Sequence, residues 1–147
     1  MSSGVARATY DDVNLVVKLY DMRREDRMRL ARVWFASSFK AKTMEDFVAL
    51  CPPGSEQNAS FRMVVSYWEM VGSFLTNGVL SAELFYQSGR EMLFVWERLR
   101  DLLPLVRAQY KNPIEYKNLE TAARAYIEWW NRQAPGAYEA FSARVRG

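Results

Sequence analysis

Apolar residues recur along the chain at steps of three and four positions, which is the period of α-helices that bury one face. The first apolar run extends over residues 10–39, and it predicts one long helix, capped by Thr9 and bent near Met22. No segment of the sequence alternates as a half-buried β-strand does. Turn residues separate the later runs, which predict helices at 44–50, 58–77, 81–87, 92–110 and 113–130 and a short helix after residue 136.

These runs predict an all-α protein, a single compact bundle of about five to seven helices. The bundle is expected to form one domain over residues 1–147, with residues 1–9 flexible. Pro104 lies inside an apolar stripe, where it should kink the helix or restart it. The strongest local signal combines an N-cap, a proline at the first helical position and a glutamate that closes a capping box: Asn112, Pro113 and Glu115.

The third predicted helix is apolar on nearly every side except along one polar line. At about 100° per residue, the members of this line lie within roughly 40° of Arg62 on either side. They are Arg62, Ser66, Glu69, Ser73 and Thr76. A helix that is apolar on its other sides is normally central in a bundle. The polar line is therefore expected to face either a narrow strip of solvent or other buried polar groups.

The favoured interpretation of the polar line is a buried network of ion pairs. Arg62 and Glu69 are about 10 Å apart along their helix, too far for a direct bond, so each needs another partner. Arg24 and Arg27 continue the apolar stripe of the first helix and are expected to point inward. Buried charges need partners because an unpaired one is costly. The ion-pair candidates are Arg24, Arg27, Arg62 and Glu69.

The alternative is a small polar pocket in the bundle that binds a ligand. Its tentative ligand-binding residues are Arg62, Ser66, Tyr67, Glu69 and Ser73, with neighbouring aromatic side chains as walls. Structural ion-pair networks imitate such sites, which is why the network is favoured.

The composition argues against most kinds of catalytic site. The chain has no histidine, a single cysteine, Cys51, and none of the glycine-rich motifs that bind phosphates or activate a serine. We therefore expect no metal, no cofactor and no catalytic residue, and Glu69 is the only acid or base that an enzyme could use. A lone cysteine excludes an internal disulfide and fits the reducing cytoplasm.

The charges give little support to a nucleic-acid partner or to a membrane. The net charge is only +3. In the arginine-rich stretch 23–32 the side chains point all around the helix and are expected to pair with acids of the same stretch. No apolar run approaches the roughly 20 residues of a membrane span, and the beginning of the chain lacks the apolar core of a signal peptide. We expect no nucleic acid and no transmembrane segment.

Several segments resemble a family of small helical bacterial proteins of unknown function. They are LYDMRRE (19–25), VWF (33–35), FRMVVSYWEMVGSFLTNGVLSAELFY (61–86), EMLFVWERLRDLLPLVR (91–107) and KNPIEYKNLE (111–120). The resemblance covers most of residues 13–120 and implies an all-α fold, with Glu69 and Arg107 at charged positions of the family's pattern. Some relatives carry an N-terminal membrane anchor, which this chain is expected to lack. The resemblance implies no catalytic residue, substrate or cofactor.

The sequence thus favours a non-enzymatic cytoplasmic protein that acts through protein-protein contacts, as a homo-oligomer or with an unknown protein partner. Trp129 and Trp130 point about 100° apart on a helix, so one is expected at the edge of the fold or in a subunit contact, unless both pack in the core. A small-molecule-binding module with a polar pocket around Arg62 and Glu69 is the alternative.

Overall fold

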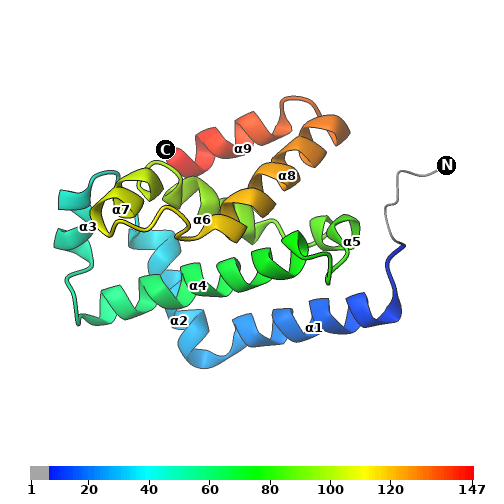
Figure 1. Ribbon diagram of the computed structural model, residues 1–147, viewed down its shortest axis with the longest axis horizontal. Helices are drawn as coiled ribbons and strands as arrows, with labels where there is room; N and C mark the ends of the chain where they lie inside the picture. Colours follow the sequence, from blue (N-terminus) through cyan, green and yellow to red (C-terminus); the bar gives the residue numbers. More distant parts are fainter. Residues whose placement is uncertain (1–6) are drawn as a thin grey trace.

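Nine α-helices follow one another in the computed structural model, which describes residues 7–147 (Figure 1). The described residues contain no β-strand, which confirms the all-α prediction. The prediction of about five to seven helices was too low, because long apolar runs that were expected to be single helices are interrupted. The helices are α1 (Tyr10–Arg24), α2 (Asp26–Ser38), α3 (Met44–Leu50), α4 (Glu56–Thr76), α5 (Ala82–Tyr86), α6 (Glu91–Leu99), α7 (Leu103–Gln109), α8 (Lys117–Gln133) and α9 (Ala137–Arg146).

The predicted first helix is divided at Glu25 into α1 and α2. Glu25 has an extended backbone, with φ −60° and ψ 143°, and its side chain accepts a hydrogen bond from the Met28 N–H at 3.1 Å. One residue therefore ends α1 and caps α2. In place of the bend expected near Met22, the structure has a complete break at Glu25.

The apolar stripe over residues 92–110 is divided as well. α6 ends at Leu99, and Pro104 is the second residue of α7. Proline is tolerated in the first turn of a helix because the N–H groups there have no partner in the helix. This confirms the restart that the sequence predicts at Pro104.

α4 lies at the centre of the fold, as its apolar surface predicts. In Figure 1 it runs between α1 on one side and α8 and α9 on the other. It ends at Thr76 with Asn77 as its C-cap, after which Gly78 has a left-handed conformation with φ +72°. The core around it is made of large side chains that are almost fully buried, among them Phe35, Phe39, Val64, Val65, Trp68, Leu80, Met92, Leu93, Leu99 and Leu119.

The start of α1 is capped by Thr9, as the sequence predicts. Thr9 and Asp12 form a capping box, in which the Thr9 N–H donates to Asp12 Oδ2 at 2.7 Å. Asp12 Oδ1 also accepts from the Ser81 N–H at 2.7 Å, which ties α1 to the residue that caps α5. Most of the flexible segment predicted at residues 1–9 falls on residues 1–6, which lie outside the described residues.

Candidate functional site

The polar line of α4 meets the beginning of α8. Glu69 Oε1 accepts a hydrogen bond from the Leu119 N–H at 2.8 Å, and Glu69 Oε2 accepts from the Asn118 side-chain amide at 2.9 Å and from the Asn118 N–H at 3.3 Å. The N–H groups of a helix's first turn have no acceptor in their own helix, and a carboxylate there also interacts favourably with the helix dipole. Glu69 therefore caps α8 from another helix.

α8 needs this cap because its own N-cap position supplies none. The helix begins at Lys117, after Tyr116 in a left-handed conformation with φ +54° and without a side-chain cap. The helix start predicted at Asn112 was wrong. The Asn112 side chain accepts from the Ile114 N–H at 3.3 Å and forms a turn, and the segment up to Tyr116 is not helical.

The backbones of α4 and α8 approach closely at this junction. An ideal Cβ on Gly72 would lie 2.8 Å from the main-chain carbon of Asn118, so only glycine fits. One turn further along α4, the Thr76 hydroxyl donates to the Asn118 side-chain oxygen at 2.6 Å. The Asn118 side chain thus donates through its amide nitrogen to Glu69 and accepts through its amide oxygen from Thr76. These contacts fix the position of α8 on α4.

Arg107, the other charged position singled out by the resemblance, acts on the same segment. Its Nε donates to the Glu115 carbonyl at 2.9 Å, and its Nη1 forms an ion pair with Glu120 Oε1 at 3.0 Å. Burial by itself would raise the pKa of Glu120, but the hydrogen bonds of Arg107 and Arg124 outweigh it and lower the pKa below its usual value. Glu69 and Arg107 therefore both bind residues at the start of α8.

Apart from Glu69 and Thr76, the members of the polar line form hydrogen bonds within α4. Arg62 is exposed, and its Nε donates to Asn58 Oδ1 at 2.9 Å. The exposed Ser66 hydroxyl donates to the Arg62 carbonyl, and the half-buried Ser73 hydroxyl donates to the Met70 carbonyl at 2.6 Å. Ligand binding by Arg62, Ser66, Glu69 and Ser73 stays a prediction.

Tyr67, the remaining tentative ligand-binding residue, is buried, and its hydroxyl donates to the Leu19 carbonyl of α1 at 2.6 Å. Burial raises the pKa of Tyr67 to about 12. Tyr67 and Ser66 line one side of a shallow groove of about 330 Å³, where the α1–α2 break meets α4. The other lining residues are Met22, Glu25, Met28, Met63 and Met70.

The predicted network of buried ion pairs was wrong. Arg24, Arg27 and Arg62 are exposed, and none of them pairs with Glu69. Val13, Val17 and Tyr20 of the predicted stripe face away from the core, and Arg24 follows Tyr20 by one turn on that exposed side of α1. Arg27 lies in the first turn of α2, beyond the break at Glu25. Burying a guanidinium group costs free energy that leaving it in water does not.

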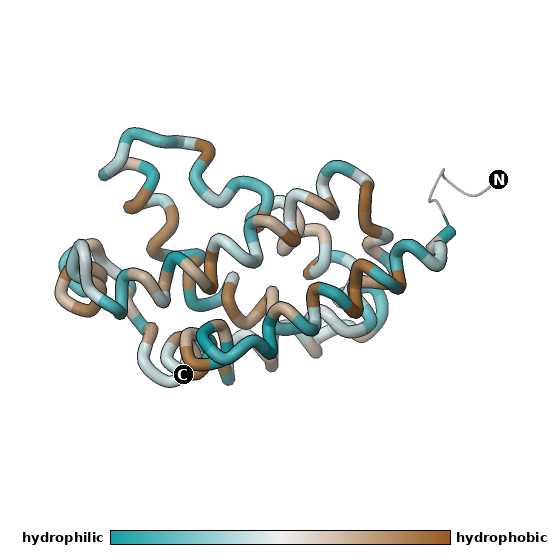
Figure 2. Tube along the Cα trace, turned by 90° about the horizontal axis from the view of Figure 1, so that it is seen from below, coloured by the Kyte–Doolittle hydropathy of each residue, from teal (hydrophilic) through white to brown (hydrophobic). Residues whose placement is uncertain are grey.

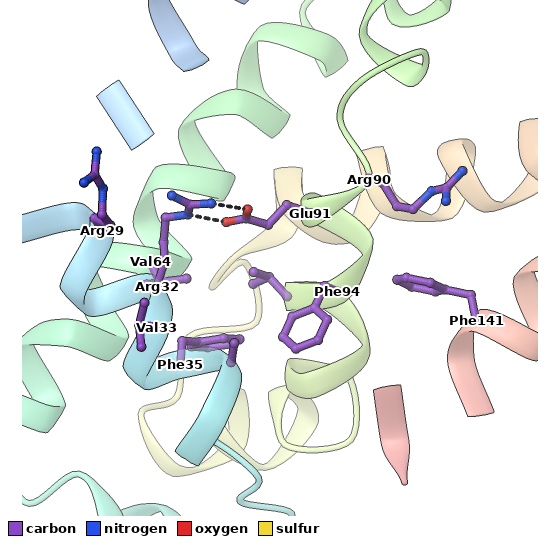
Figure 3. A pocket seen from close by; sticks show the side chains of 11 residues that line it. Arg29, Arg32, Val33, Phe35, Val64, Arg90, Glu91, Phe94 and Phe141 are labelled. Atoms are coloured by element: carbon purple, nitrogen blue, oxygen red, sulfur yellow. Dashed lines mark hydrogen bonds and ion pairs between the residues drawn. The ribbon is translucent and has the colours of Figure 1, made fainter. Parts of the chain in front are cut away.

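The sequence pattern missed a second groove, which lies between α2 and α6 and is shown in Figure 3. At its edge Arg32 Nε and Nη2 each donate to a carboxylate oxygen of Glu91 at 2.7 Å, and Arg23 approaches the same carboxylate to 3.4 Å. The hydrogen bond with Glu91 raises the pKa of Arg32 above its usual value. The arginine-rich segment was expected to pair with its own acids, but the acid that binds Arg23 and Arg32 comes from α6.

The groove has a volume of about 570 Å³ and a mostly apolar lining. Arg29 and Arg90 line it as well, and neither forms an ion pair with a described residue. The arginine run and the Arg90–Glu91 pair are visible in the sequence, but no periodicity connects two segments almost 60 residues apart. We name this feature the arginine-rimmed groove; its lining residues are Arg29, Arg32, Val33, Phe35, Ala36, Val64, Arg90, Glu91, Phe94, Val95 and Phe141.

Both adjacent tryptophans are half-buried and packed against aromatic side chains. Trp129 donates to Glu83 Oε1 at 3.3 Å and its ring lies 5.2 Å from that of Tyr86. The ring of Trp130 lies 5.4 Å from that of Phe141. Each tryptophan is thus partly covered by aromatic side chains of its own chain, and a subunit contact at one of them stays a prediction.

The rest of the described chain offers few other sites. Cys51 is buried, and burial raises the pKa of its thiol to about 11. Among residues 7–147, no three acidic or cysteine side chains come close enough together to hold a metal ion. None of the helices that the structure describes is long and apolar enough to cross a membrane.

No curated protein and no solved structure matches this chain. A family described as a domain of unknown function, DUF4760, matches residues 8–129. The match contains Glu69, Gly72, Arg107 and Asn118 and every segment of the resemblance described above. Because it covers most of the chain, the protein belongs to the DUF4760 family.

Proposed function

We propose that the protein acts by binding other protein molecules without catalysis, and that the outer face of α1 pairs two copies of the chain. The absence of histidine from the sequence supports a non-enzymatic role. The single buried cysteine fits a reducing compartment, and we place the protein in the cytoplasm. The ligand pocket around Arg62 and Glu69 has less support, because the Glu69 carboxylate is bound by α8.

The observation that carries this proposal is an exposed apolar stripe on α1. Tyr10, Val13, Val17 and Tyr20 are 79%, 43%, 55% and 48% exposed. They follow one another at steps of three, four and three residues, the spacing by which two helices interlock side chains along a seam. Figure 2 looks at the molecule from the side of α1, and brown, apolar residues recur along that helix.

A surface helix normally has one apolar face, but α1 is apolar on two sides. Leu15, Val16 and Leu19 pack against the core, so the exposed stripe is not needed for folding. Contiguous apolar surface that folding does not use is typical of interaction sites. We call this stripe of Tyr10, Val13, Val17 and Tyr20 the outer α1 stripe.

The charges of α1 favour an antiparallel pair. Arg24 is exposed in the last turn, one turn after Tyr20 on the same side of the helix as the outer α1 stripe. A parallel pair would place the two Arg24 side chains next to each other, whereas an antiparallel pair places them at opposite ends of the contact. A contact restricted to one helix lies at the low end of stable interfaces, so we expect a dimer with a dissociation constant of micromolar order.

Sedimentation equilibrium over a series of protein concentrations tests the pairing. The wild-type protein should form dimers, and Val17→Lys should be monomeric because the contact would bury an unpaired ammonium group. Val48→Lys is the matched control, since Val48 is 49% exposed on α3. A wild-type chain that is monomeric throughout, or an equal loss in both variants, contradicts the proposal.

Mixing the wild type with Arg24→Asp tests the antiparallel direction. In an antiparallel pair the side chains at position 24 of the two copies do not meet, so mixed dimers should form in statistical proportion. Native mass spectrometry of the mixture measures the proportions. A clear preference for mixed dimers contradicts the antiparallel direction, because opposite charges at position 24 attract each other only where the copies are parallel.

A further inference from the structure

We propose that the arginine-rimmed groove binds a small amphiphilic anion, with an apolar chain in the groove and a carboxylate or phosphate head at its arginines. The groove volume of about 570 Å³ is in the usual range of small-molecule sites. Its lining contains no residue of α1, so this inference does not depend on the pairing of the outer α1 stripe.

The lining requires that the body of the ligand be apolar. None of the 11 lining side chains carries a hydroxyl or an amide group. A sugar, a nucleotide base or a peptide group that lay against the apolar lining residues would lose hydrogen bonds to water without gaining new ones. An alkyl chain or a ring loses none. The apolar lining residues are Val33, Phe35, Ala36, Val64, Phe94, Val95 and Phe141.

The charges of the rim require that the head of the ligand be anionic. Three arginines and one glutamate line the groove, which leaves two positive charges in excess. Glu91 is occupied by Arg32, through both carboxylate oxygens, and by Arg23. All three nitrogens of the Arg32 guanidinium also have acceptors, since Nη1 donates to the Arg23 carbonyl at 3.0 Å. The positive charge in excess therefore belongs to the other two arginines.

Arg29 and Arg90 are available for a ligand. Both are exposed, and in Figure 3 they lie on opposite sides of the Arg32–Glu91 pair. Arg29 donates only to a main-chain carbonyl, that of Arg24, at 3.1 Å, and the Arg90 guanidinium lies 4.4 Å from the ring centre of Trp130. Guanidinium groups bind carboxylate and phosphate through two parallel hydrogen bonds. The head would lie at the rim and the chain over Phe94.

Isothermal titration with simple amphiphiles, below the concentrations at which they form micelles, tests the proposal. Each buried CH₂ group adds about fourfold to affinity, so dodecanoate should bind about 15-fold more tightly than decanoate. Dodecyltrimethylammonium, with the same chain and the opposite charge, should bind far more weakly. Equal binding of the anion and the cation, or no dependence on chain length, overturns the proposal.

Dodecyl phosphate distinguishes the two possible heads. Tighter binding of dodecyl phosphate than of dodecanoate assigns a phosphate head, and the reverse assigns a carboxylate. Inorganic phosphate alone should not bind measurably, because the chain supplies most of the affinity. Binding of inorganic phosphate as tight as that of dodecyl phosphate overturns the amphiphile.

Variants locate the site. Arg29→Gln combined with Arg90→Gln should lower the affinity for dodecanoate at least about tenfold, since the charge-assisted contact of the head is lost on whichever side of the Arg32–Glu91 pair it binds. Arg132→Gln combined with Arg144→Gln removes the same charge from exposed arginines elsewhere and should change little. Ala36→Trp places bulk in the groove from an exposed position and should abolish binding. Unchanged affinity in the first double variant, or an equal loss in the second, overturns the proposal.

Discussion

The junction of α4 with α8 and the outer face of α1 use side chains in opposite ways. At the junction, polar side chains lie between two packed helices: Glu69 and Asn118 are half-buried, and together with Thr76 they bind one another or the backbone. On α1, apolar groups lie outside the fold, and Tyr10 and Val17 are more than half exposed. A polar line on an apolar helix can thus serve helix packing, whereas the outer α1 stripe is apolar surface that folding leaves exposed.

The strongest test of the junction is a side chain at Gly72. Gly72→Val should lower the free energy of unfolding by about 2–3 kcal/mol, because the new Cβ would meet the backbone of α8. Urea denaturation measures the change. Ala59→Val, at an exposed position of the same helix, is the control and should cost far less. Similar losses in both variants would mean that α4 and α8 do not approach as described.

The next largest effect is expected at Glu69. Glu69→Ala leaves the N–H groups of Asn118 and Leu119 without an acceptor and should cost about 2 kcal/mol, whereas Glu69→Gln keeps an acceptor and should cost about 1 kcal/mol. Thermal and urea denaturation give the energies, and amide exchange at Leu119 should accelerate. Arg62→Ala, on the same polar line, should stay within about 0.5 kcal/mol. A loss at Arg62 equal to that at Glu69 would restore the network interpretation.

The smallest effect is expected at Asp12, on the inner side of α1. Its carboxylate accepts hydrogen bonds from backbone N–H groups, as the Glu69 carboxylate does at the junction. Hydrogen bonds from the backbone of Thr9 and of Ser81 lower the pKa of Asp12 below its usual value. A lowered folded-state pKa means that the stabilisation is present above the unfolded pKa of about 4 and is lost as the pH falls through the folded value.

Melting curves of wild type and Asp12→Asn at a series of pH values measure this effect. The wild type should melt at the higher temperature near neutral pH, and the difference should shrink as the pH falls below about 4. A difference that stays constant down to about pH 2 would show that the Asp12 charge is not bound in the folded state.

Local signals in the sequence placed most helices correctly. Thr9 caps α1 as predicted, and Thr43 and Ser81 cap α3 and α5 in the same way, because a cap needs only the residue itself and the N–H groups that follow it. Asn112 carries the same kind of signal, yet it starts a turn. Its segment is held by Arg107, which binds the Glu115 carbonyl, so a tertiary contact prevailed over the local preference.

The candidate sites were predictable only in part. Glu69 was recognisable as a charge on an apolar helix, but its partner was not, since the main-chain N–H groups of Asn118 and Leu119 look like those of any residue. The arginine-rimmed groove was missed because Arg32 and Glu91 are far apart in the sequence, and nothing local relates them.

By itself, the sequence determined the helical class, the central place of α4 and the presence of one charge that needed a partner there. Hydrophobic periodicity and caps act over a few residues, so they can be read from the chain alone. Only the tertiary structure decided that Glu69 caps α8, that Arg24 and Arg27 face water and that Glu91 forms ion pairs with Arg23 and Arg32. These outcomes depend on the rotation and spacing of helices, which packing of the whole core sets.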